Sequence, residues 1–168
     1  MIEIAVLNQS WSSTTDWDAL CDRCLFVAVA ATPYAALATS LTPVEVSIKF
    51  TSDAEVQSLN RDYRGKDRPT NVLSFPMFAR TDIAALATSD DPEILLGDIV
   101  LAQGICQAEA SKRGVLVTAH ATHLLVHGLL HLLGYDHIGE DEAVVMETLE
   151  QKIMAQLGLH NPYEPVEE

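Results

Sequence analysis

The sequence is poor in positive charge, in cysteine and in aromatic side chains. Ten Lys and Arg stand against 24 Asp and Glu in 168 residues, which gives a formal net charge of −14. That balance argues against a general nucleic-acid-binding protein, because the neutralisation of phosphates needs basic side chains. Three cysteines are an odd number, and the pair Cys21-x-x-Cys24 has no second pair to complete a zinc site. The helical spacing of this pair instead favours packing in the core.

A membrane segment and an export signal are not expected either. The N-terminus lacks the basic start of a secretory signal peptide. Residues 24–41 carry no charge, but Pro33 interrupts them and much of the stretch is Ala, Thr and Ser. We therefore expect a cytoplasmic protein with no membrane contact.

The length fits a single domain, residues 1–168, that can bury a core and ends in a loose acidic tail at about 162–168. Alternation and β-branched residues predict four strands, at Ile2–Leu7, Val44–Phe50, Asn71–Phe75 and Ile94–Ala102. Apolar periodicity and capping residues predict five helices. These begin at the capping box Thr15-x-x-Asp18, at Ser52-x-x-Glu55 (with Tyr63 facing inward), and near Gln103, Leu116 and Glu140. Residues 77–93 are expected to form a flexible surface loop, and the fold class is α+β.

Three histidines stand at metal-binding spacing in the segment HGLLHLLGYDH, residues 127–137. His127 and His131 are four residues apart, so on a helix they lie about 40° apart and one turn above each other. Gly134 can adopt the left-handed conformation that ends a helix, which would bring His137 to the same ion. Three nitrogens leave the fourth position of a tetrahedral Zn²⁺ open for water, as in a catalytic site. The spacing predicts one Zn²⁺ per chain, held by His127, His131 and His137.

Gly128 occupies the position at which the metzincin motif H-E-x-x-H-x-x-G-x-x-H carries its glutamate. That glutamate is the general base that takes a proton from the zinc-bound water of the peptidases. Glycine has no side chain that could do so. We therefore expect a zincin-like metal helix without the peptidase's base.

Other polar residues are each compatible with more than one role. Asp98 is the one charged residue in an apolar strand, where a carboxylate is either solvated at an edge or part of a site. His120 and His123 precede the metal pair on the same side of the helix, so they are either packed or placed beside the metal. A basic cluster that could hold RNA on this acidic body lies within eight positions: Arg61, Arg64, Lys66 and Arg68.

Three segments in chain order carry a family resemblance: RGKDRPTNVLSFP (64–76), LLGDIV (95–100) and HGLLHLLGYDH (127–137). Together they resemble the YbeY family of bacterial ribosomal RNA maturation factors. The resemblance extends from about residue 44 to Tyr163, and the first 43 residues match nothing specific. It implies one mixed four-stranded sheet and a zinc-dependent, single-strand-specific endoribonuclease. The implied role is ribosomal RNA maturation, including the 3′ end of 16S ribosomal RNA, and ribosome quality control, with the ribosome or ribosomal proteins as partners.

By motif position Arg64 resembles the functionally important arginine of that family. Phosphodiester cleavage builds charge on phosphate oxygens, so a guanidinium is the natural complement to the missing glutamate. Arg64 and His127 are the expected catalytic residues, while Asp98, Asp136 and bulk hydroxide all stay open as the base. Two other functions also stay open. One is a metallopeptidase. The other is a non-catalytic ribosome-associated factor, in which a fourth protein ligand completes the zinc site and the zinc only stabilises the fold.

Overall fold

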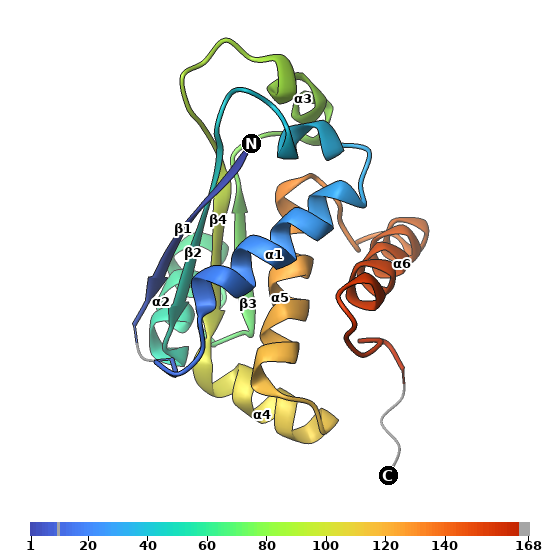
Figure 1. Ribbon diagram of the computed structural model, residues 1–168. Helices are drawn as coiled ribbons and strands as arrows, with labels where there is room; N and C mark the ends of the chain where they lie inside the picture. The colour runs from blue at the N-terminus through green and yellow to red at the C-terminus, as the bar shows by residue number, and fades with distance from the viewer. Residues whose placement is uncertain (10, 165–168) are drawn as a thin grey trace.

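Four strands form one mixed sheet, which carries the helices α1 (Trp17–Ala30) and α5 (Val117–Leu132) on one face (Figure 1). This computed structural model describes residues 1–9 and 11–164, and the spatial order of the strands is β1-β2-β4-β3. Strand β2 is parallel to both β1 and β4, whereas β3 is antiparallel to β4. The α+β class with a mixed four-stranded sheet is therefore confirmed. The strands are β1 (Ile2–Asn8), β2 (Val44–Thr51), β3 (Val72–Pro76) and β4 (Ile94–Ala102).

The described residues contain six α-helices rather than the expected five. The extra one is a single turn, α3, inside the segment 77–93 that we expected to be an irregular loop. It forms because Ile83 is buried in the core, as is Leu86 in the following 3-10 turn η2 (Ala84–Thr88). These two side chains pack the segment against the rest of the protein. The helices are α1 (Trp17–Ala30), α2 (Asp53–Arg64), α3 (Arg80–Ile83), α4 (Gln103–Arg113), α5 (Val117–Leu132) and α6 (Glu140–Gln156).

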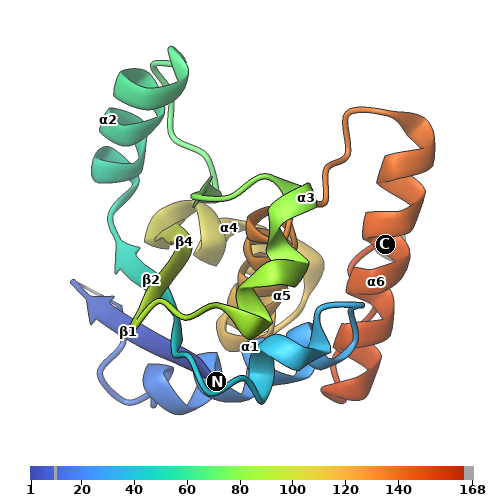
Figure 2. The same ribbon diagram turned by 90° about the horizontal axis from the view of Figure 1, so that it is seen from above.

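Helices cover both faces of the sheet (Figures 1 and 2). On one face α1 packs on β1 and α5 packs on β3 and β4, and together they enclose the main core. On the opposite face α2 packs on β3 and β4 over a small separate cluster that includes Val56, Leu73 and Val100. Helix α6 is the outermost element and contacts α5 and α1. The C-terminal half of α5 is thereby placed between β3 and α6.

Two local expectations about helix α1 and helix α2 were wrong. The residue that caps α1 is Asp16 rather than Thr15, because its carboxylate accepts a hydrogen bond from the backbone N–H of Ala19 at 3.0 Å. Tyr63 does not face inward but is 73% exposed, since α2 projects beyond the sheet at this end. Its ring instead lies edge-on to Phe75 at 5.6 Å.

Helix α5 is buried on almost every side, which explains its nearly continuous apolar sequence. Among the described residues, no single helix is both long and apolar enough to cross a membrane. Helices α4 and α5 reach that length only together, across a bend of 114°.

Candidate metal and active site

His127 and His131 project from the same side of α5, one turn apart. Their ring centroids are 4.6 Å apart, and the two Nε2 atoms lie 3.1 Å from each other. The ring of His137, from the loop after the helix, lies 5.4 Å from that of His127 and 5.1 Å from that of His131. One nitrogen from each ring falls within 4.8 Å of the others. The structure thus brings together the three histidines that the spacing predicted.

Gly134 makes this convergence possible by ending α5 in a left-handed turn. Its φ is 93°, and the turn is closed by hydrogen bonds from Gly134 N to His131 O and from Tyr135 N to Leu130 O. A Cβ at position 134 would also lie 2.4 Å from Cβ of Arg80, the first residue of α3. Conformation and space both require glycine here.

The hydrogen bonds of the two helical histidines show that they are suited to a metal ion. Nδ1 of His127 donates to a carboxylate oxygen of Glu150 at 2.7 Å, and Nδ1 of His131 donates to the carbonyl oxygen of Tyr135 at 3.0 Å. Neutral rings with protons on Nδ1 carry lone pairs on Nε2, and two such lone pairs at 3.1 Å repel unless a cation lies between them. Burial, and after it the neighbouring charge of His127, lowers the pKa of His131 to about 4. A proton is therefore disfavoured as the cation between the two Nε2 atoms.

The separation of the nitrogens agrees with this interpretation. A tetrahedral ion with metal–nitrogen bonds of about 2.0–2.1 Å holds its ligands about 3.3 Å apart. The observed 3.1 Å between the Nε2 atoms of His127 and His131 is close to that separation. The three-histidine cluster can therefore hold one metal ion.

Gly128 lies on the side of α5 that packs closely against β4. A Cβ at this position would stand 2.9 Å from Cγ2 and 3.3 Å from Cδ1 of Ile99, which is fully buried in β4. The position therefore faces the sheet, and a glutamate there would have to push α5 off β4. The absence of the peptidase's base has a packing reason.

The three histidines line a groove of about 730 Å³ that lies between β3, the segment leading into α3, and the loop after α5. The charged side chains that line it are three cations, Arg64, Lys66 and Arg80, and one carboxylate, Asp136. The acidic body therefore carries a locally positive groove, which removes the conflict between net charge and an RNA substrate. The side chain of Arg64, at the end of α2, makes no hydrogen bond or ion pair with any other residue in the ranges 1–9 and 11–164.

Several predicted residues lie outside the groove. Asp98 points to the opposite face of the sheet, where it lines a separate hollow with Lys49 and Glu55, so it is not a base for chemistry at the metal cluster. Arg61 pairs with Asp62, and Arg68 does not line the groove. The position of Asp98 follows from the alternation of side chains along β4, because Gly97 and Ile99 face α5 and Asp98 faces α2.

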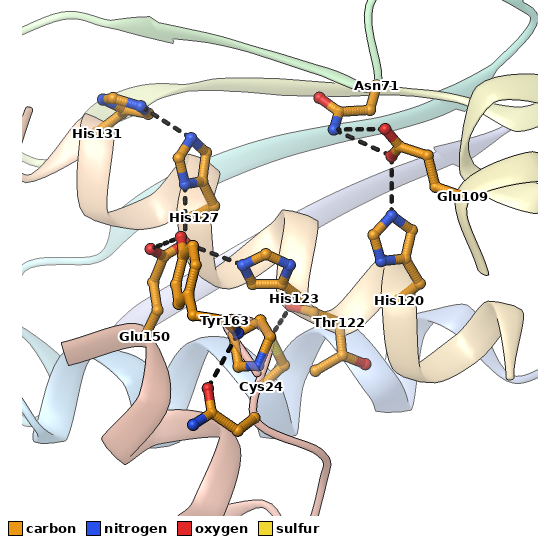
Figure 3. A network of polar contacts seen from close by, with 12 residues as sticks. Cys24, Asn71, Glu109, His120, Thr122, His123, His127, His131, Glu150 and Tyr163 are labelled. Atoms are coloured by element: carbon orange, nitrogen blue, oxygen red, sulfur yellow. Dashed lines mark hydrogen bonds and ion pairs between the residues drawn. The ribbon is translucent and has the colours of Figure 1, made fainter. Parts of the chain in front are cut away.

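His120 and His123 are both packed against carboxylates, as Figure 3 shows. Nε2 of His120 bonds Glu109 at 2.9 Å, and Glu109 also accepts from Asn71 in the groove wall. Nε2 of His123 bonds Glu150 at 3.1 Å. His123 thus lies beside the metal cluster and contacts it through a carboxylate.

Sequence reasoning missed Glu150, Tyr163 and Arg80. Burial raises the pKa of Glu150, but hydrogen bonds from His123 and His127 outweigh it and lower the pKa to about 2. The guanidinium carbon of Arg80 lies 4.5 Å from the centre of the Tyr135 ring. This contact packs the segment 77–83 onto the loop after α5 that carries His137. The sequence held a weak signal for Glu150 alone, as an acidic residue on the apolar side of a helix.

Comparison with known proteins identifies the family. A family model described as "Endoribonuclease YbeY" matches residues 6–158. The chain belongs to the YbeY endoribonuclease family. It is 53% identical over 164 residues to the Endoribonuclease YbeY of Rhizorhabdus wittichii, covering 97% of each chain. It is 54% identical over 153 residues to that of Sphingopyxis alaskensis, covering 91% of each.

A solution structure of a Thermotoga maritima protein shares the YbeY-like fold. Its TM-score is 0.54 at 20% identity, covering 97% of this chain and 100% of that one. The family match begins well before residue 44, so the N-terminal segment that resembled nothing specific belongs to the YbeY family fold. The sequence of this segment did not indicate the family, because β1 and α1 contribute residues to the core and none of the side chains that line the site.

Proposed function

We propose that the protein is an endoribonuclease of ribosomal RNA maturation that cuts single-stranded RNA in the groove above its three histidines. The observation that carries this proposal is the shared groove, because one hollow joins a cluster suited to a metal with the unpaired Arg64 and with Lys66 and Arg80. The high identity to proteins named Endoribonuclease YbeY supports it. The finer proposals are a cytoplasmic protein that works with the ribosome or ribosomal proteins, on the 3′ end of 16S ribosomal RNA and in ribosome quality control.

Zinc is the metal we propose, one ion per chain, held by His127, His131 and His137. Three imidazoles and an open position suit Zn²⁺. When bound, the ion would supply a Lewis acid for a phosphate oxygen and would acidify a water molecule.

The remaining chemistry falls to side chains of the groove. Arg64 can place its planar guanidinium on two oxygens of one phosphate, which lysine cannot do. Lys66 and Arg80 add positive charge along the RNA backbone. Asp136 is the one carboxylate among the lining residues, and it accepts the backbone N–H of His137 at 2.7 Å. With Asp98 on the far face, Asp136 and bulk hydroxide are the two candidates for the base.

The size of the groove supports a single-stranded substrate. A volume of about 730 Å³ is that of a small-molecule pocket, which admits unstacked nucleotides but not a duplex. Gly128 argues against the metallopeptidase, since its position cannot hold the catalytic glutamate without disrupting the contact with Ile99.

The test is cleavage of a labelled single-stranded RNA by the purified protein, with and without a chelator. A duplex of the same sequence and the variant His127→Ala are run beside it. We expect cleavage of the single strand alone, lost with chelator and in His127→Ala. No cleavage by metal-loaded wild type would favour the non-catalytic factor, and chelator-sensitive cleavage of casein would favour the peptidase.

A further inference from the structure

Glu150 is a fully buried carboxylate between the metal cluster and the C-terminal segment (Figure 3). One of its oxygens, Oε1, accepts hydrogen bonds from His127 at 2.7 Å and from His123 at 3.1 Å. The other, Oε2, accepts the hydroxyl of Tyr163. A buried carboxylate is costly unless it is hydrogen-bonded, and this one accepts from three donors, two on α5 and one in the C-terminal segment.

We propose that Glu150 is a positioning residue, which holds His127 in the tautomer and orientation that present Nε2 to the metal, and that Tyr163 holds Glu150. This inference rests on the metal site of the proposed function but not on ribonuclease activity. Carboxylates commonly accept the second N–H of a metal-bound histidine, and in doing so they fix the ring and raise its basicity.

The direction of the hydrogen bonds supports this role. A carboxylate can only accept, so both His123 and His127 must donate to it. In a neutral ring the proton of His127 therefore lies on Nδ1, and its Nε2 keeps a lone pair directed at His131. Without Glu150 a neutral imidazole would divide between two tautomers, and the form protonated at Nε2 cannot bind the ion. Nδ1 of His123 is buried without a partner among the described residues, as suits the unprotonated nitrogen of a ring that donates through Nε2.

The contact with Tyr163 makes the C-terminal segment part of the site. We expected the chain beyond Pro162 to be loose, and residues 165–168 of that acidic tail lie outside the described residues. Pro162 and Tyr163 are instead held, because Arg113 donates to the carbonyl of Pro162 at 2.7 Å and the Tyr163 ring lies edge-on to His123 at 5.8 Å. Tyr163 thereby contacts the carboxylate oxygen of Glu150 that His127 does not use.

A purely structural role for the cluster predicts something different. In that case the hydrogen bonds only satisfy buried polar groups, and a change at Glu150 would lower stability without changing how the remaining histidines bind metal. Metal affinity and the tautomer of His127 distinguish the two roles, because both can be measured on protein that is still folded.

The experiment compares wild type with Glu150→Gln, which keeps the shape and removes the charge, and with Tyr163→Phe. The matched control is Glu142→Gln, since Glu142 is an exposed acid on the same helix. The affinity for Zn²⁺ is measured by competition with a chromophoric chelator. The proton position on His127 is read in metal-free protein from ¹⁵N chemical shifts of the imidazole, and thermal unfolding checks the fold.

We expect Glu150→Gln to bind Zn²⁺ about 10–100-fold more weakly and to shift His127 toward the Nε2-protonated tautomer. Tyr163→Phe should weaken binding several-fold, and Glu142→Gln should match wild type. Zn²⁺ affinities of folded Glu150→Gln and Tyr163→Phe equal to that of wild type would overturn the role of Glu150 while leaving the metal site intact. If Glu150→Gln does not fold, Tyr163→Phe decides, and equal affinity there overturns the proposal. A wild type that binds no Zn²⁺ would overturn the metal site itself, and the role of Glu150 with it.

Discussion

Replacing Gly128 by alanine should destabilise the protein or leave it unchanged, although glycine-to-alanine changes inside helices usually stabilise. The new Cβ would lie 2.9 Å from Cγ2 of Ile99, about 0.6 Å or more inside the normal carbon–carbon contact distance. Ile99 is β-branched and fully buried, so it cannot swing aside. Overpacking costs about 1–3 kcal/mol, and the helix gains about 1 kcal/mol from alanine. The net loss is roughly 0–2 kcal/mol, and the melting temperature should fall by up to about 8 °C.

A double-mutant cycle with Ile99→Ala makes this prediction sharper. Ile99→Ala removes all three side-chain atoms that the new Cβ would meet, Cγ2, Cδ1 and Cγ1, so Gly128→Ala in that background should stabilise by about 1 kcal/mol. Gly128→Ala should therefore stabilise only in the Ile99→Ala background, with a coupling of about 1 kcal/mol or more between the two substitutions. Urea unfolding followed by circular dichroism measures all four proteins. An equal stabilisation in both backgrounds would refute the close contact, and with it the packing reason for the missing glutamate.

Three further predictions concern the groove and its surroundings. Arg64→Lys should lower RNA cleavage at saturating substrate on the order of ten-fold or more with metal content unchanged, and full activity would leave Arg64 as only a positive charge. His127→Ala combined with His131→Ala should reduce bound metal from about one ion per chain to almost none, as measured by elemental analysis of untagged protein. A hydrogen bond from His120 lowers the pKa of Glu109 below its usual 4.5, so the ionised carboxylate stabilises the fold above that pH and loses this effect as the pH falls. Urea unfolding should therefore show Glu109→Gln less stable than wild type near neutral pH, with the difference narrowing in acid.

The parts of the site that follow from local geometry could be predicted from the sequence. His127 and His131 are brought together by the helical repeat, and Gly134 turns His137 back toward them within three residues. Strand β2 was equally clear, because alternate residues from Val44 to Phe50 are fully buried. In each case the interacting groups lie within a few residues of one another, so spacing alone determines their arrangement.

The parts that depend on how distant elements pack could not be predicted. Glu150 meets His127 across 23 positions, and only the packing of α6 on α5 makes them neighbours. The face on which Asp98 lies depends on the register of β4 between β2 and β3. Arg80 belongs to a short helix that is stabilised mainly by burying Ile83. Tyr63 resembled a core residue because an amphipathic pattern does not show where a helix extends beyond its sheet.

The parallel pairing of β2 with both β1 and β4 has a consequence for folding. Ile2 pairs with Val44, and Val44 pairs with Ile94, so each ladder joins segments more than 40 residues apart. Such long-range pairing makes folding slow, in the range of milliseconds to seconds for sheets of high contact order. The loop that carries His137 is held both by its own turn at Gly134 and by its packing against Arg80 in the folded protein. An ion that needs all three histidines therefore binds the native state, and it should prolong the life of the folded protein by slowing unfolding rather than by speeding folding.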